Sequence, residues 1–189
     1  MKHLPIYSYL IIFFWFVFLA YWGISGLKTK RNINTPSALR GGLFRLVIGV
    51  VVVVVLSQNN SFKILTTPIT NPALNIIGVV LCGLGIGFAI WARYHIGRNW
   101  GMPMSVKENP ELVTSGPYRY IRHPIYTGVI FALLGTALDN TGIVFVIFLL
   151  FATYFIYSAV KEEKAMMQEF PEQYPAYKQK TKMIIPLIF

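Results

Sequence analysis

The chain is 189 residues long, 55% of them hydrophobic and 13% charged, and its mean hydropathy is +0.56. A soluble domain of this size needs a more polar and more highly charged surface, so the composition excludes an ordinary soluble globular protein. The net charge of +10 raises the possibility of nucleic-acid binding. The basic residues, however, lie in a few segments between apolar runs instead of forming one stripe on a folded surface, and this excludes that class.

Five apolar runs predict five transmembrane helices. The first is long enough for the ~20 residues that cross a bilayer core, and it lacks the small-residue cleavage site of a signal peptide. The fourth is short, so its helix must be tilted or extended by residues of the preceding turn. The alternative is one anchor helix attached to a domain with a buried core. The runs are residues 5–24, 43–57, 73–92, 127–138 and 142–160.

The segments between these runs differ in charge. Residues 26–45, 92–126 and 161–182 each carry five Lys or Arg, whereas residues 58–72 carry only Lys63 and residues 139–142 carry none. Basic loops remain on the cytosolic side of a membrane. With five spans, this places the N-terminus outside and the C-terminus in the cytosol, and all the chemically interesting polar residues lie on the cytosolic side.

Metal and nucleotide motifs are absent from the sequence. Cys82 is the single cysteine, and the three histidines stand far apart without a metal-ligand spacing, so we predict no disulfide and no metal. The glycines of GLGIG, residues 83–87, lie inside an apolar run rather than between a strand and a helix. The spacing of Gly83 and Gly87 therefore favours close approach of a neighbouring helix over cofactor binding. No Rossmann-type βαβ pattern or internal repeat is present, so the sequence predicts one all-α domain over residues 1–189.

The polar segment 91–126 is too long for a simple connection. Within it, residues 114–117 read TSGP, which is typical of a turn, and Pro124 is suited to the first turn of the next helix. His123 then lies beside the free backbone N–H groups of that helix, where a carboxylate can bind. The alternative is structural: the tyrosines form an interfacial aromatic belt, and Arg119 and Arg122 are membrane-edge anchors.

A second polar cluster, Lys-Glu-Glu-Lys at residues 161–164, follows the fifth apolar run. We expect Glu162 and Glu163 to end that helix, where acidic groups oppose the helix dipole. Either the flanking lysines or a bound cation must then compensate them. A carboxylate at the membrane edge can accept hydrogen bonds from an ammonium or a ribose, and a solvated charge pair with Lys161 or Lys164 is the alternative.

The order of these motifs resembles a known family. RNWG at 98–101, ELVTSGPYRYIRHPIYTG at 111–128, KEE at 161–163 and the following EFPEQYPAYKQKT with its closing IIP are similar to the isoprenylcysteine carboxyl methyltransferase (ICMT) family. This family belongs to a wider group of integral-membrane methyltransferases that includes the phospholipid N-methyltransferases. The resemblance covers roughly residues 90–189, whereas residues 1–90 match only as membrane helices.

The resemblance implies an enzyme that uses S-adenosylmethionine without a Rossmann domain. Residues 93–189 form the catalytic half, and the linker and the C-terminal segment close a cytosol-facing cofactor pocket that a lipophilic acceptor reaches from the bilayer. His123 and its backbone then suit the methionine carboxylate of the cofactor, and Glu162 suits its ammonium or its ribose hydroxyls. The matched cofactor-binding positions are Leu112, Val113, Tyr118, His123, Pro124, Tyr126 and Glu162.

One position departs from the family. The prenylcysteine enzymes carry an arginine four residues before the glutamate, and this chain has Ser158 there, preceded by Tyr157. A hydroxyl does not replace a bidentate guanidinium, so this departure counts against a prenylcysteine substrate but leaves the cofactor site unchanged. We expect a lipophilic acceptor, for which a prenylcysteine carboxylate is one candidate beside a phospholipid amine and a small hydrophobic thiol. Tyr157, Ser158 and Arg122 are the candidate substrate-binding residues, and no residue is identified as a catalytic acid or base.

Two other classes stay open from the sequence. A sterol-reductase-like membrane oxidoreductase shares a comparable C-terminal architecture with NADPH as cofactor, although its members are longer. A small transporter needs polar or broken helices at the middle of the bilayer, and the first, second and fifth runs are almost uniformly apolar.

Overall fold

The computed structural model of the chain describes residues 5–27, 32–34, 69–101, 106–107, 111–139 and 142–185. The main elements in this part of the chain are five helices: α1 (Ile6–Gly26), α4 (Pro72–Ile96), α5 (Pro124–Leu138), α6 (Gly142–Glu169) and α7 (Gln173–Lys180). Two short 3₁₀ helices, η2 (Gly97–Asn99) and η3 (Gly116–Arg119), and two short strands, β1 (Asn32–Asn34) and β2 (Val106–Lys107), complete them.

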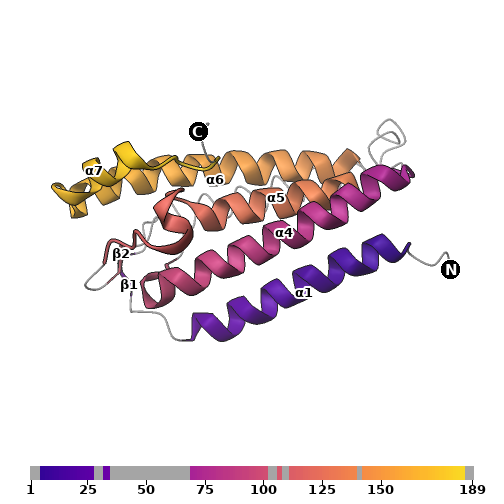
Figure 1. Cartoon of the computed structure of the whole chain (residues 1–189), viewed down its shortest axis with the longest axis horizontal. Coiled ribbons are helices and arrows are strands. Elements are labelled where there is room, and N and C mark those ends of the chain that lie inside the picture. The colour runs from indigo at the N-terminus through magenta and orange to yellow at the C-terminus, as the bar shows by residue number, and fades with distance from the viewer. Residues whose placement is uncertain are drawn as a thin grey trace.

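The long helices cross the molecule side by side (Figure 1). α1, α4 and α6 are long and apolar enough to span a membrane, and α5 is a shorter apolar helix of 15 residues. The chain is therefore a helical integral membrane protein. The predicted second span, residues 43–57, lies outside the described residues, so the count of five spans stays a prediction.

The helix ends follow from local sequence. The side chain of Asn71 caps α4 by accepting hydrogen bonds from the backbone N–H groups of Ala73 and Leu74, and Pro72 occupies the first turn. Gly97 has a positive φ of 53° and ends the helix. α5 begins as predicted, with His123 before the first turn and Pro124 within it.

α6 runs further than the sequence predicted. Glu162 and Glu163 do not end the helix, because it continues to Glu169. The two carboxylates therefore do not face a helix C-terminus, and the proposed conflict with the helix dipole does not arise. Partners from other elements compensate them instead, as described below.

Glycines bring α4 and α5 together, at positions other than those expected. A Cβ on Gly85 would lie 2.6 Å from the carbonyl oxygen of Gly128, and one on Gly78 would lie 2.6 Å from that of Gly135. The two helices thus touch backbone to backbone at two points seven residues apart. The predicted pair behaves differently: Gly83 faces the Phe14 ring of α1, and Gly87 faces open space.

The helices gather their polar ends at one end of the molecule. The end of α4, the start of α5, the charged end of α6, α7 and the β1–β2 pair all lie together there, opposite the N-terminus (Figure 1). Residues distant in sequence can therefore meet at this end, and the predicted site residues belong to these elements.

Candidate active site

The loop before α5 has a conformation that only glycine adopts easily. Gly116 has a φ of +57°, and a Cβ at this position would overlap the ring of His95. The η3 turn that follows buries Pro117 and Tyr118. Residues 120–123 then lead to the first turn of α5, and the close contact with His95 on α4 limits where the start of η3 can lie.

The C-terminal segment, residues 181–185, pairs with the residues that precede α5. Arg122 donates its backbone N–H to the Lys182 carbonyl (2.8 Å), and His123 donates its own to the Met183 carbonyl (3.1 Å). Ile121 and Lys182 form a parallel bridge. One turn further along, the Thr127 hydroxyl donates to the Ile184 carbonyl at 2.6 Å. The backbone on both sides of His123 is therefore fixed by residues more than fifty positions away.

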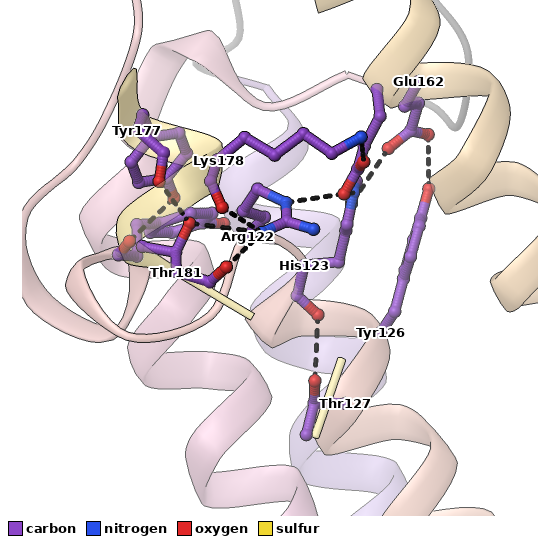
Figure 2. Close-up of polar contacts among 10 residues, drawn as sticks. Arg122, His123, Tyr126, Thr127, Glu162, Tyr177, Lys178 and Thr181 are labelled. Atoms are coloured by element: carbon purple, nitrogen blue, oxygen red, sulfur yellow. Dashed lines mark hydrogen bonds and ion pairs between the residues drawn. The ribbon is translucent and has the colours of Figure 1, made fainter. Parts of the chain in front are cut away.

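Three predicted site residues converge at the boundary between α5 and α6. The Tyr126 hydroxyl donates to Oε1 of Glu162 at 2.5 Å, and the other carboxylate oxygen, Oε2, lies 3.4 Å from Nδ1 of His123. The His123 and Tyr126 rings stack in parallel, with centroids 5.5 Å apart and planes 5° apart. Figure 2 shows the imidazole and the phenol both pointing at the same carboxylate.

Glu163 is oriented away from Glu162, toward a different set of partners. Its Oε1 lies 2.6 Å from Nε of Arg122, and its Oε2 lies 2.6 Å from Nζ of Lys178 on α7. The Arg122 guanidinium also donates to the Thr181 carbonyl. These contacts connect α6, the start of α5 and the C-terminal segment; Figure 2 shows Arg122 between Lys178 and Thr181 on one side and His123 on the other.

The electrostatics of Glu163 agree with this geometry. The residue lies in the charged end of α6, beyond the apolar run that ends at Val160. Burial by itself raises the pKa of the Glu163 carboxyl, but the hydrogen bonds and charges of Lys178 and Arg122 outweigh it and lower that pKa below its usual value. Glu163 is therefore a stable carboxylate in a structural ion pair.

The remaining predicted cofactor residues lie around this centre. Tyr118 is buried, its carbonyl accepts a hydrogen bond from the Tyr177 hydroxyl (2.7 Å), and burial, then Tyr177 and Glu162, raise its pKa. Tyr118 is thus a neutral phenol within electrostatic reach of Glu162. Pro124 is fully buried in the first turn of α5. Leu112 and Val113 are half-buried in the irregular stretch before η3, and no hydrogen bond or ring contact among the described residues joins them to His123 or Glu162.

The predicted substrate residues point in different directions. Ser158 is fully buried within the protein, whereas the neighbouring Tyr157 is exposed, with the Lys161 ammonium 5.6 Å from its ring centroid. Arg122 is held by the Glu163 carboxylate and by the backbone carbonyls of Lys178 and Thr181. The structure therefore does not gather these three side chains into one surface.

Sequence reasoning missed the C-terminal partners of the site. Thr127, Tyr177, Lys178 and Thr181 anchor the stretch around His123, but each is a common polar residue with no motif of its own. One signal for these contacts was present in the sequence: Glu163 is a second acid next to Glu162, and the family resemblance gave it no role. A buried acid needs a cation, and Arg122 was already present in the matched motif.

One family model matches the chain, and several known proteins are similar to it. The family model described as phospholipid methyltransferase matches residues 74–173, more than half of the chain. The chain is 25% identical over 169 residues to the nickel-cobalt-cadmium resistance protein NccN of Alcaligenes xylosoxydans, covering 85% of this chain and 74% of that protein.

Two similar enzymes are methyltransferases by name. Methanethiol S-methyltransferase of a Pseudomonas species is 26% identical over 139 residues, covering 65% of this chain and 53% of that enzyme. Protein-S-isoprenylcysteine O-methyltransferase of Schizosaccharomyces pombe is 29% identical over 126 residues, covering 61% and 53%. The chain thus spans about half the length of each of these two relatives. The family match includes α5 and the charged end of α6, which carry the centre described above, and the chain belongs to the phospholipid methyltransferase family of membrane proteins.

Proposed function

We propose that this chain is an S-adenosylmethionine-dependent methyltransferase that acts on a lipophilic acceptor at the cytosolic face of its membrane. The observation that carries the proposal is the convergence of His123, Tyr126 and Glu162 in one place. The family membership supplies the reaction class. The basic segments supply the orientation, with the N-terminus outside and the C-terminus in the cytosol.

The residues present fit this cofactor. Nε2 of His123 is buried and has no hydrogen-bond partner among the described residues, and Oε1 of Glu163 is 3.8 Å away. A buried polar atom without a partner is expected to meet one in the working protein. The cofactor carries a carboxylate, an ammonium and an aromatic base. The protein offers the His123 imidazole for the first, the Glu162 carboxylate for the second, and the Tyr118 and Tyr126 rings for the third.

Each side chain has a definite task in this proposal. Glu162 accepts hydrogen bonds from the ammonium or the ribose hydroxyls, and its own position is fixed by the Tyr126 hydroxyl. His123 offers Nε2 to the methionine carboxylate, and the C-terminal segment holds its backbone. Tyr118 and Tyr126 exclude water from the reacting centre. When bound, the cofactor supplies an electrophilic methyl group on sulfur, and the protein contributes mainly alignment.

The acceptor is a small hydrophobic thiol or a phospholipid amine rather than a prenylcysteine carboxylate. Ser158 occupies the place of the expected arginine and is fully buried. Arg122 could replace that arginine by charge, but its Nε and Nη1 already bind Glu163 and the Thr181 carbonyl. A bidentate grip on a second carboxylate is therefore not available from Arg122 in this arrangement. The exposed Tyr157 face of α6 gives a lipophilic acceptor a route from the bilayer.

The test is ligand-induced stabilisation of the purified full-length protein in detergent. S-adenosylmethionine or S-adenosylhomocysteine is expected to raise the Tm, while NADPH leaves it unchanged; the reverse pattern supports a reductase and refutes the proposal. His123→Ala and Glu162→Gln should each reduce the cofactor-induced shift. Glu169→Gln changes an exposed position at the end of the same helix as Glu162 and should leave the cofactor-induced shift unchanged.

A second experiment identifies the acceptor. It measures radiolabelled methyl transfer to small thiols, phosphatidylethanolamine and prenylcysteines.

A further inference from the structure

A pocket lies beside the ion pair of Glu163 and Arg122, and both residues belong to its lining. It has a volume of about 560 Å³ and lies between α6 and the C-terminal segment. None of the three converging residues, His123, Tyr126 and Glu162, belongs to its lining. The lining residues are Arg122, Val160, Glu163, Lys164, Met167, Lys178, Thr181, Lys182 and Met183, and we refer to them as the cationic pocket.

The charge of the cationic pocket is strongly positive. Four of its residues are Lys or Arg and one is Glu, so the lining carries a formal charge of 4 − 1 = +3. Glu163 is already shared between Arg122 and Lys178, which leaves Lys164 and Lys182 without a carboxylate in the lining. Nη2 of Arg122 makes no hydrogen bond within the described part of the chain, since only Nε and Nη1 have partners. The pocket therefore offers an anion one guanidinium nitrogen and two ammonium groups that have no carboxylate partner within the described part of the chain.

The remaining lining is apolar and continues along α6. Val160, Met167 and Met183 form the apolar part of the pocket. Exposed hydrophobic side chains continue from the pocket along one face of α6, because they recur at intervals of four and seven residues. These are Phe145, Leu149, Ile156, Val160 and Met167.

This arrangement matches one kind of ligand. We propose that the cationic pocket binds the phosphate of an anionic phospholipid, whose acyl chains lie along the exposed stripe of α6. The pocket begins where the apolar part of α6 ends and its charged part begins, which is the depth at which lipid phosphates lie. A zwitterionic headgroup would bring a positive group next to a lining of charge +3, so the charge favours an acidic lipid.

Such a lipid is a resident of the protein and is not the methyl acceptor. Arg122 and Glu163 line the pocket, and each is the chain neighbour of a residue of the converging centre, His123 and Glu162 respectively. A lipid bound in the pocket would therefore help to hold the backbone at both of those residues. The proposal does not depend on the proposed methyl transfer, because none of the three converging residues lines the pocket.

The experiment measures lipid binding to the full-length protein in mixed micelles. Phosphatidylglycerol with short acyl chains should raise the Tm in a saturable manner, whereas phosphatidylcholine with the same chains should not. The double variant Lys164→Glu with Lys182→Glu should weaken the apparent affinity for phosphatidylglycerol about tenfold or more. The control is Lys161→Glu with Lys180→Glu, which changes the net charge equally on exposed positions outside the lining and should keep the affinity.

Each outcome decides the proposal. If both double variants lose affinity equally, the lipid is attracted by overall charge and the pocket assignment is wrong. If glycerol 3-phosphate binds as tightly as the lipid, the pocket is an anion site with no role for the acyl chains, and the lipid proposal is wrong. The unliganded Tm shows that each variant is folded. The shift induced by S-adenosylmethionine should be the same in wild type and both double variants, which separates failure of this proposal from failure of the proposed function.

Discussion

Nδ1 of His123 lies 3.4 Å from Oε2 of Glu162, although the two residues belong to different helices and are 39 positions apart in the sequence. His123 precedes the first turn of α5, and Glu162 lies in the charged part of α6, seven residues before the helix ends. Tyr126 joins them, since it stacks on the imidazole and donates its hydroxyl to the carboxylate. Two side chains at the start of α5 therefore orient the Glu162 carboxylate, which belongs to α6.

Removal of the Tyr126 hydroxyl tests how much that orientation matters. Tyr126→Phe keeps the stack on His123 but removes the hydrogen bond to Glu162. One such bond contributes ~1 kcal/mol, so we expect the affinity for S-adenosylmethionine to fall roughly three- to tenfold with little change in the unliganded Tm. Titration calorimetry measures the affinity. Tyr157→Phe is the control, because Tyr157 is exposed and its hydroxyl has no hydrogen bond in the described part of the chain.

The ion pair beside this centre should be important for stability. Glu163→Gln leaves the buried Arg122 guanidinium without its carboxylate, and a buried charge that has lost its partner costs of order 3 kcal/mol. We expect a clear fall in Tm and faster proteolysis of the C-terminal segment, which Lys178 and Thr181 connect to Arg122. Glu169→Gln removes an exposed acid from the same helix, and an equal fall in that variant would contradict the assigned role.

The same pair predicts an acid dependence. The pKa of Glu163 is lower in the folded protein than its ordinary value of 4.5. Its stabilising contribution is therefore complete above the ordinary pKa and is lost as the pH falls from there through the lowered one. Wild type should lose Tm over this range, and the difference between wild type and Glu163→Gln should shrink as the pH falls. A constant difference across pH 3–6 would show that the carboxylate is not the source.

Local patterns predicted the described helices well, because helix formation depends on short stretches of sequence. The cofactor-binding role of His123, Tyr126 and Glu162 came from the family resemblance and stays a prediction. Apolar runs located the described long helices, and the Arg-His-Pro stretch located the start of α5. The end of α6 was wrong because the helix is apolar only to Val160, and beyond it the charged turns are stabilised by contacts with α5 and α7. Arg122 and Glu163 are 41 positions apart in the sequence, and no local pattern reports such a contact.

The glycine contacts between α4 and α5 give the sharpest test of the packing. Gly85→Ala places a Cβ 2.6 Å from the backbone nitrogen of Ala132 and from the Gly128 carbonyl oxygen, so the helices must move apart. Overpacking of this kind costs about 1–3 kcal/mol, and we expect a lower Tm in detergent. Gly87→Ala, two residues away on the same helix, meets no atom within 4 Å. It should leave the Tm unchanged or raise it, because alanine favours a helix over glycine by about 1 kcal/mol. Equal effects at the two positions would show that the close approach is not at Gly85.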